Sequence, residues 1–254
     1  MSKALLLEAH LKRLRMPTVA SLYLNLAREA ETNNETYESY LLALLDAEVQ
    51  QRDINVQKAR MKRAKFPTAK TLEEFDFSAL PEINSSRFLT LAHNSYIEKK
   101  ENILLIGPCG VGKTHLAIGL GIAACRARKK VRFITTPALV NELVEARENH
   151  KLSRVEASFA KLDLLILDEF GFVPFPKDGA ELLFHLIASK YERGSIILTS
   201  NLEFSKWTDV MGDQALAGAF VDRLTHHAHI IQITGDSYRF KNSLQTKKKS
   251  KKKS

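Results

Sequence analysis

The residues of this chain best suited to chemistry form one glycine-rich run with a lysine and a threonine at its end. Residues 107–114 read GPCGVGKT, between the apolar run 102–106 and a helix-like stretch at 115–126. Glycine-rich backbone can wrap a phosphate with its N–H groups, and the N-terminus of a following helix adds positive partial charge. A chance turn with a surface lysine would not need this strand, loop and helix in order. The pattern therefore predicts a nucleoside triphosphate site.

The contacts in that site follow from the residue types. Lys113 is expected to reach the β- and γ-phosphates, and the Thr114 hydroxyl is expected to ligate Mg²⁺. The residues predicted to line the nucleotide are Gly107, Pro108, Cys109, Gly110, Val111, Gly112, Lys113, Thr114 and His115.

A second acidic element follows the loop by some fifty residues. Residues 164–169 read LLILDE, an apolar strand that ends in two adjacent carboxylates, as in a Walker B segment. Asp168 is expected to hold the Mg²⁺ shell through water. Glu169 is the better candidate to orient and activate an attacking water. A polar strand end would look the same in isolation, but the phosphate loop upstream favours the site.

Two more polar residues extend the candidate machinery. Asn201 follows the apolar run 195–199 and can hydrogen-bond both a γ-phosphate and a water, although asparagine after a strand is often only a turn former. Arg223 comes about twenty residues later, on a predicted helix that leads away from the site. It suits an arginine finger offered to a neighbouring subunit. The alternatives are a surface arginine or an ion pair within its helix.

Composition sets the class of protein. The chain has 254 residues, of which 44% are hydrophobic, enough for one α/β core and a small appendage. Neither an 18-residue apolar run nor a signal peptide is visible, so we expect no membrane partner and a cytoplasmic location. Two cysteines provide neither a disulfide framework nor a metal quartet. Residues 225–229 read THHAH, but no acid or cysteine lies at ligand spacing nearby, which argues against zinc.

The net charge of +9 is unevenly distributed. Six lysines of the last eight residues account for two thirds of it. Such a tail is expected to be disordered and to add salt-sensitive, sequence-blind attraction to phosphates, or only solubility. Six further basic residues lie between 58 and 70 with no acid among them. They fit a DNA-contacting surface and a solvated helix face equally well.

Hydrophobic periodicity divides the chain into regions. Residues 1–66 show helical spacing, broken at 16–17 and 33–34 into about three helices, and are expected to serve self-association or partner binding. A linker is predicted at 67–84. Strand and helix signals alternate from 85 to 240, with helices near 86–100, 137–150, 153–161 and 179–193 and a fifth strand at 229–233. This indicates a parallel five-stranded sheet with helices on both faces, followed by a tail at 241–254.

The order of phosphate loop, Walker B DE, TSN at 199–201 and DRL at 222–224 resembles the AAA+ ATPases, in the branch of helicase loaders and transposition helpers. Within it the chain resembles the IstB family, ATPases encoded beside the transposase of bacterial insertion sequences. The segments that carry this resemblance are 11–17, 64–67, 72–77, 190–195, 199–201 and 237–239. It covers nearly everything except the lysine tail.

The resemblance implies ATP and Mg²⁺ as ligands, with Lys113, Thr114, Asp168, Glu169 and Arg223 in the roles above. Asn201 would be the first sensor. Phe75 and Phe77 would help enclose the adenine, or else simply pack. About 31 residues follow Arg223, too few for the C-terminal lid of most AAA+ proteins. Arg239 would then substitute for a second sensor or be a surface residue.

The resemblance also implies rings or spirals of this chain around duplex DNA. Arg147, Lys151 and Arg154 are the candidate phosphate contacts, with bases largely unread, although they would also suit a solvated face. The assembly would select or deform target DNA and recruit or activate a transposase. Two alternatives stay open. A replicative helicase loader shares such a core, and a small-molecule P-loop kinase would act as a monomer without DNA.

Overall fold

The computed structural model describes residues 2–79 and 84–235. The chain divides into two compact units, residues 1–59 and 60–254. The sequence predicted that the N-terminal region ends at residue 66, whereas the first unit ends at residue 59. Residues 60–66 belong to the second unit, because Ala64 and Phe66 pack into its core. No helix within the described residues is long and apolar enough to span a membrane. Arg239 and the predicted tail at 241–254 lie outside the described residues, as does the region in which a lid would follow the last strand.

The first unit is helical, as predicted. It contains α1 (Lys3–Arg13), α2 (Pro17–Thr32) and the first part of α3 (Tyr37–Ala64). Pro17 occupies the first turn of α2, where its missing N–H costs nothing. Leu11, Val19 and Leu44 form its small core.

A glutamate from α3 caps the start of α2. Oε2 of Glu48 accepts hydrogen bonds from the backbone N–H groups of Thr18 (2.9 Å) and Val19 (3.2 Å), and Nε of Arg52 donates to Oε1 (2.8 Å). Burial raises the pKa of Glu48, but these hydrogen bonds outweigh it and hold the pKa below its ordinary value. A buried carboxylate therefore ties two helices together.

The second unit is built on a five-stranded parallel sheet, which confirms the predicted fold class. The strands are β1 (Asn102–Ile106), β2 (Val131–Thr135), β3 (Leu164–Phe170), β4 (Ser195–Ser200) and β5 (Ala228–Gln232), in the order β2-β3-β4-β1-β5. All neighbouring pairs are parallel. Every residue of β1 and β4 is buried, as expected for central strands covered on both faces.

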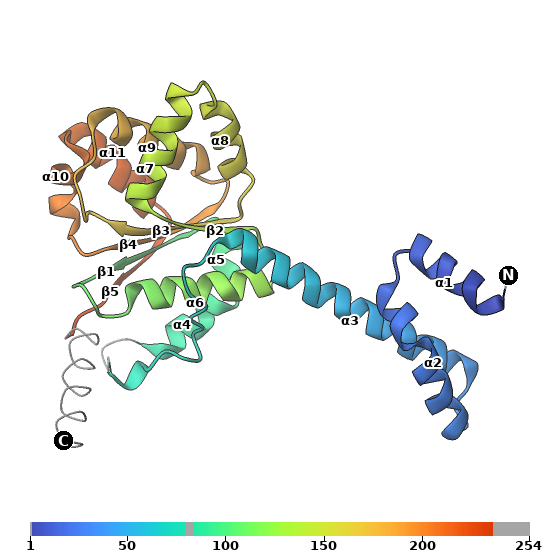
Figure 1. Cartoon of the computed structure of the whole chain (residues 1–254). Helices are drawn as coiled ribbons and strands as arrows, with labels where there is room; N and C mark the ends of the chain where they lie inside the picture. Colours follow the sequence, from blue (N-terminus) through green and yellow to red (C-terminus); the bar gives the residue numbers. More distant parts are fainter. Residues whose placement is uncertain (1, 80–83, 236–254) are drawn as a thin grey trace, which may run out of the picture. The chain divides into compact units, whose positions relative to one another are not determined.

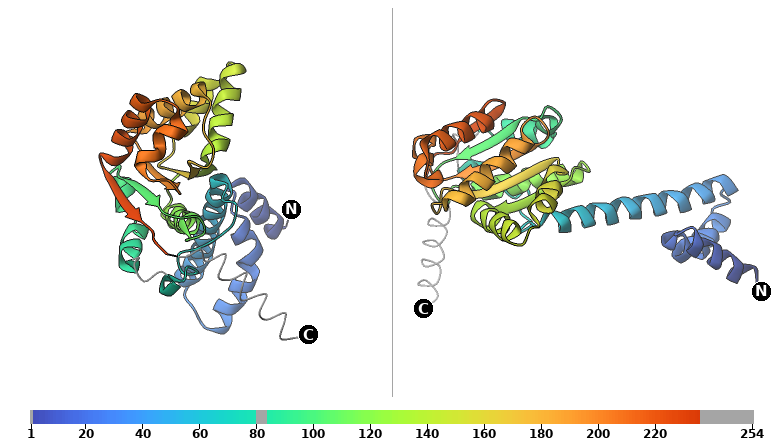
Figure 2. Two further views of the ribbon diagram at one scale, coloured as in Figure 1. Left: turned by 90° about the vertical axis from the view of Figure 1, so that its left-hand side faces the viewer. Right: turned by 90° about the horizontal axis from the view of Figure 1, so that it is seen from above.

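Helices cover both faces of this sheet (Figures 1 and 2). One face carries α4 (Ser85–Ala92), α5 (Ser95–Glu98) and α6 (Lys113–Arg126). The other carries α7 (Thr136–Glu148), α8 (Leu152–Ala160), α9 (Lys177–Lys190), α10 (Trp207–Met211) and α11 (Gln214–Thr225). Short 3₁₀ helices lie at Phe77–Ala79 and Phe204–Lys206. The single helix predicted near 86–100 is two, because Asn94 adopts a left-handed conformation between them.

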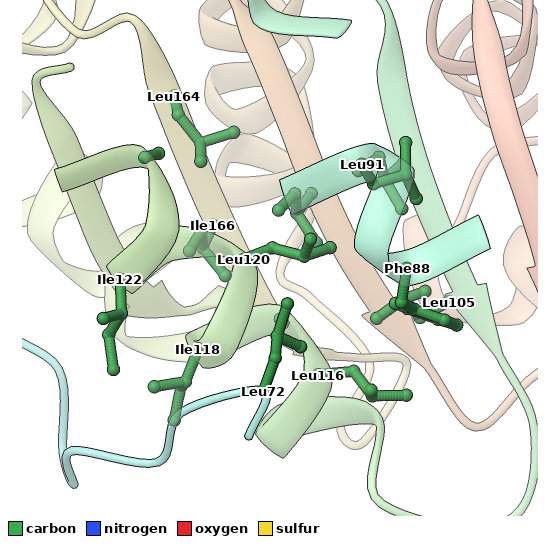
Figure 3. Close-up of a cluster of buried hydrophobic side chains, with 14 of the residues drawn as sticks. Leu72, Phe88, Leu91, Leu105, Leu116, Ile118, Leu120, Ile122, Leu164 and Ile166 are labelled. Carbon is green, nitrogen blue, oxygen red and sulfur yellow. The ribbon is translucent and has the colours of Figure 1, made fainter. Parts of the chain in front are cut away.

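The segment before α4 packs along α6. We call residues 66–77 the α6 strap. Leu72 joins the core formed by α6, β1 and β3 (Figure 3). Gly119 of α6 allows this approach, since a Cβ there would lie 2.7 Å from Cδ2 of Leu72. The residues predicted as the start of a linker therefore cover the helix that follows the phosphate loop.

Candidate functional site

Asp168 lies at the centre of the candidate site, where β3 ends. Its side chain is buried, with 3% of the residue exposed. The Thr114 hydroxyl at the start of α6 donates to it, at 2.9 Å from Oδ1 and 3.0 Å from Oδ2. These two residues, predicted as the metal ligands, thus meet across 54 positions of sequence. Hydroxyl and carboxylate oxygens are the hard donors that Mg²⁺ prefers, so the pair fits that ion.

Thr199 of β4 links the two Walker B carboxylate residues. Its hydroxyl donates to Oδ1 of Asp168 (2.5 Å) and accepts from the backbone N–H of Glu169 (3.1 Å). Thr199 is 1% exposed. A buried hydroxyl needs hydrogen-bond partners within the protein, and Asp168 and the backbone of Glu169 provide them. One side chain therefore fixes the position of one carboxylate and the backbone of the other.

Glu169 has an unusual backbone for its residue type. Its φ is 61°, in the left-handed region, and the pairing of β3 with β4 shifts register between Leu167 and Phe170. Such a conformation is uncommon for a side-chain-bearing residue and recurs at functional sites. The irregularity exposes Glu169 while both its neighbours stay buried. Across residues 2–79 and 84–235, no hydrogen bond or ion pair engages its carboxylate, which leaves it available to accept a proton.

The phosphate loop is held between β1 and its two neighbours. The N–H of Gly107 donates to the carbonyl of Ser200 on β4 (3.1 Å), and the N–H of Ile233 after β5 donates to the carbonyl of Ile106 (2.7 Å). Nζ of Lys113 donates to the carbonyls of Gly107 (2.6 Å) and Pro108 (2.7 Å). These contacts place the ammonium inside the loop that phosphates would enter.

The α6 strap also contacts the loop. Gly112 has a φ of 94°, and a Cβ there would lie 2.6 Å from Cε2 of Phe75, so only glycine fits this position. The His115 ring packs edge-on against Phe75, with ring centroids 5.1 Å apart, and its Nε2 lies 2.7 Å from the carbonyl oxygen of Thr71. Phe77 lies 4.8 Å from Phe75 between ring centroids. Packing of these phenylalanines is thus observed, and their predicted contact with adenine stays a prediction.

Asn201 lies beside the phosphate loop, at the end of β4. It is exposed and follows Ser200, whose carbonyl binds Gly107 of the phosphate loop. Its position beside the loop suits the predicted sensor role, which stays a prediction.

Arg223 lies at the opposite end of the sheet. It is on α11, one residue before Leu224, whose carbonyl accepts a hydrogen bond from Nδ2 of Asn102 at the start of β1 (3.0 Å). The phosphate loop follows the other end of that five-residue strand, on the order of 15 Å away. Nη1 of Arg223 donates to the carbonyl of Ala219 (3.3 Å), and its guanidinium carbon lies 4.7 Å from the centroid of the Phe184 ring. Arg223 therefore does not reach the phosphate loop of its own chain.

The three candidate DNA contacts gather at the turn between α7 and α8. Arg147, Lys151 and Arg154 are all exposed. Arg147 already forms an ion pair with Asp178 of α9, with Nη2 and Oδ2 2.7 Å apart. Lys151 precedes α8, and Arg154 lies in its first turn.

Two threonines that complete the site carry no sequence motif of their own. Thr199 was visible only as part of a TSN run. Thr136 is fully buried at the start of α7 and donates its hydroxyl to the carbonyl of Asp168 (3.0 Å). The only signal in the sequence that could have found them is a polar residue at the end of an apolar strand. That pattern occurs at the ends of β2, β3 and β4.

Comparison with known proteins gives concordant results. Residues 9–246 match the model of a family described as IstB-like ATP binding protein. The chain is 40% identical over 239 residues to the insertion sequence IS5376 putative ATP-binding protein of Geobacillus stearothermophilus, covering 94% of this chain and 95% of that protein. It is 39% identical to the insertion sequence IS21 putative ATP-binding protein of Pseudomonas aeruginosa, covering 92% and 89%.

Two solved structures share the fold at low sequence identity. One is AMPPCP-bound DnaA from Aquifex aeolicus, with a TM-score of 0.57, 23% identity, and coverage of 72% of this chain and 56% of that one. The other is the DnaC helicase loader, with a TM-score of 0.54, 18% identity, and coverage of 65% and 97%.

Proposed function

Since the chain belongs to the family of IstB-like ATP-binding proteins, with the P-loop AAA+ fold, we propose that it is an ATPase that assembles on duplex DNA. In this proposal it selects or remodels target DNA and recruits or activates the transposase of an insertion sequence. The observation that carries the ATPase part is the buried carboxylate of Asp168, which faces the phosphate-loop Thr114 at 2.9 Å.

The chain's own residues divide the work of hydrolysis. Lys113 exchanges the carbonyls of Gly107 and Pro108 for phosphate oxygens when ATP enters the loop. Thr114 and Asp168 would hold Mg²⁺, which neutralises charge on the β- and γ-phosphates when bound. Glu169 accepts a proton from the attacking water, because its carboxylate is exposed beside the metal ligands.

Arg223 supplies the missing positive charge from a second copy. Its place at the far edge of the sheet prevents it from serving the site of its own chain. A head-to-tail contact between copies brings the far edge of one to the phosphate loop of the next. ATP then contributes to assembly, because it binds at a contact that only the oligomer completes.

Helix α7 offers a route from the ATP site to DNA. It begins at Thr136, bonded to Asp168, and ends beside the turn that carries Lys151. Its 13 residues span about 20 Å as a rigid rod. Arg147, Lys151 and Arg154 would bind DNA phosphates, which gives affinity without sequence preference.

Sedimentation with duplex DNA tests the proposal. ATP and DNA together should drive wild-type protein into a large complex, which Glu169→Gln should trap because it binds ATP without hydrolysing it. Glu181→Gln, which changes an exposed glutamate of α9, is the matched control and should behave as wild type. A protein that stays monomeric under every condition, yet consumes ATP with a small-molecule acceptor, would favour the kinase alternative.

The helicase-loader alternative concerns the partner and not the ATPase core. It predicts that a replicative helicase co-purifies with the assembled protein. Recovery of the transposase encoded beside this chain would instead support the proposed role.

A further inference from the structure

Three side chains that can bind a metal ion meet at the edge of the sheet far from the phosphate loop. Glu192, His226 and His227 are exposed, and one ligand atom from each lies within 4.8 Å of the others. Glu192 comes from the α9–β4 connection, and the two histidines come from the α11–β5 connection. The fold brings Glu192 to these histidines from 34 positions before His226 in the chain. The spacing of the histidine run, which argued against zinc, could not include Glu192, because that residue becomes a neighbour only through the fold.

Ordered backbone holds the two histidines. The N–H of His226 donates to the carbonyl of Asp222 in the last turn of α11 (3.0 Å). The carbonyl of His227 accepts from the N–H of Asn102, the first residue of β1 (2.7 Å). His229, the third histidine of the run, is engaged elsewhere, with its Nε2 2.9 Å from Oε2 of Glu101.

Glu192 is held just as firmly. The N–H of Tyr191 donates to the carbonyl of Ile187 (3.1 Å), and that of Arg193 donates to the carbonyl of Lys190 (3.0 Å). Glu192 itself has a φ of 58°, a left-handed conformation that turns the chain sharply after α9. Ligands fixed on packed elements lose little entropy when they bind an ion.

Tyr191 adds an outer contact typical of metal-binding histidines. Its hydroxyl lies 2.7 Å from Nδ1 of His226. When Nδ1 carries the proton, it donates to Oη and leaves the Nε2 lone pair for a metal.

We propose that Glu192, His226 and His227 bind Zn²⁺, with a fourth position left to water. Two imidazoles and one carboxylate form a donor set that zinc uses in proteins. The ion would fasten the end of α9 to the end of α11. Those two helices also hold Arg223, which lies on α11 over the Phe184 ring of α9. The zinc would thereby brace the arginine finger, a consequence that rests on the proposed function of Arg223.

Titration of the full-length protein with Zn²⁺ by calorimetry tests the site. Wild type should bind one tight equivalent, and both Glu192→Gln and His227→Ala should weaken that binding at least tenfold. Tyr191→Phe should weaken it by about tenfold, because outer contacts of this kind are worth 10- to 100-fold in affinity. His150→Ala removes an exposed histidine at the α7–α8 turn and should change nothing. Equal affinity in wild type and both ligand variants would overturn the site.

A second measurement separates the site from the brace. Removal of zinc should lower DNA-stimulated ATPase several-fold in wild type but not further in His227→Ala, while Arg223→Ala should still bind zinc. If zinc binds as predicted but neither the wild type nor any variant hydrolyses ATP, the proposed function fails and the zinc site stands. If ATPase is normal and zinc does not bind, the site fails and the function stands.

Discussion

The two edges of the parallel sheet differ in what their polar residues contact. At the carboxyl edge, Asp168, Thr114 and Thr199 form a connected hydrogen-bond network that is buried or half-buried. At the amino edge, Arg223 of α11 lies over the Phe184 ring. Glu192 of the α9–β4 turn lies beside two exposed histidines. One edge is organised around ligands that enter it, whereas the other presents groups outward.

This difference is the basis for proposing that the active site is divided between two copies. The carboxyl edge contains the phosphate loop, the proposed metal ligands Thr114 and Asp168 and the proposed base Glu169, but within the described residues no arginine of α11 lies there. The amino edge contains that arginine but no phosphate loop. The proposed function needs both edges, and under that proposal two copies of the chain supply one edge each.

Mixing two inactive variants gives the sharpest test of this division. Arg223→Ala and Glu169→Gln should each lose 10³- to 10⁵-fold in ATPase rate, because a finger and a base are each required. Mixed in equal amounts, they should recover activity, since some contacts pair an intact Glu169 with an intact Arg223. Steady-state ATPase with DNA measures this. No recovery on mixing, with both variants shown to co-assemble, would place Arg223 in its own chain's site.

Thr199→Val should disconnect the carboxyl edge without changing its shape. Valine is close in size but cannot donate to Asp168 or accept from the N–H of Glu169. We expect kcat to fall about 100-fold, and folding stability to fall by about 1–3 kcal/mol for the unpaired groups. Thr199→Ser retains the hydroxyl and should keep most activity. A valine variant as active as the serine variant would show that this hydroxyl does not organise the site.

Lys190 places a buried ionisable group at the amino edge, so its titration should make the stability of the fold depend on pH. It is 1% exposed, and its Nζ donates to the carbonyl of Leu162 (2.8 Å) near the end of α8. Burial lowers the pKa of Lys190 to about 8, from 10.5. The unfolded chain therefore holds more protons between these values, and unfolding free energy rises with pH there.

Denaturation of wild type and Lys190→Met measures this effect. The stability of wild type relative to the variant should be flat below pH 8 and should rise by about 2 kcal/mol between pH 8 and 9.5. ATPase at neutral pH should change little, because Lys190 lies away from the phosphate loop. A difference that stays constant with pH would mean that Lys190 titrates normally.

The smallest effect concerns the two thiols. Cys109 is exposed in the phosphate loop, whereas Cys125 is buried on α6, and burial raises the pKa of Cys125 to about 11. A thiol reagent at pH 8 should therefore label one cysteine, and ATP should slow that labelling about tenfold by covering the loop. Cys109→Ser should abolish it. Rapid labelling of Cys125 would show that α6 opens readily.

The contiguous parts of the site were accessible from sequence. Lys113, Thr114, Asp168 and Glu169 each stand in a motif whose flanking strand or helix is visible as an apolar run. Such motifs carry their own context, so both the fold class and the meeting of Thr114 with Asp168 followed from them.

Contacts between distant segments were not accessible. The Thr199 hydroxyl is shared between Asp168 and Glu169, and the ion pair of Arg147 with Asp178 joins two helices. Glu192 reaches the histidines of another connection. None of these pairs has a fixed spacing in sequence, because each depends on which strands become neighbours. The left-handed backbone of Glu169 was hidden for the same reason, as it arises from the register of β3 against β4.

The strand order also dictates when the protein can first hold a nucleotide during its synthesis. The phosphate loop follows β1, yet β1 pairs with β4, where Ile103 lies opposite Ile197. A nascent chain that has passed the loop but not reached residue 195 lacks that neighbour and the Thr199 hydroxyl. Pairing across such separations is slow and late. We expect ribosome-bound chains halted before residue 195 to release an ATP analogue that longer chains retain, so that ATP guides only the last stage of folding.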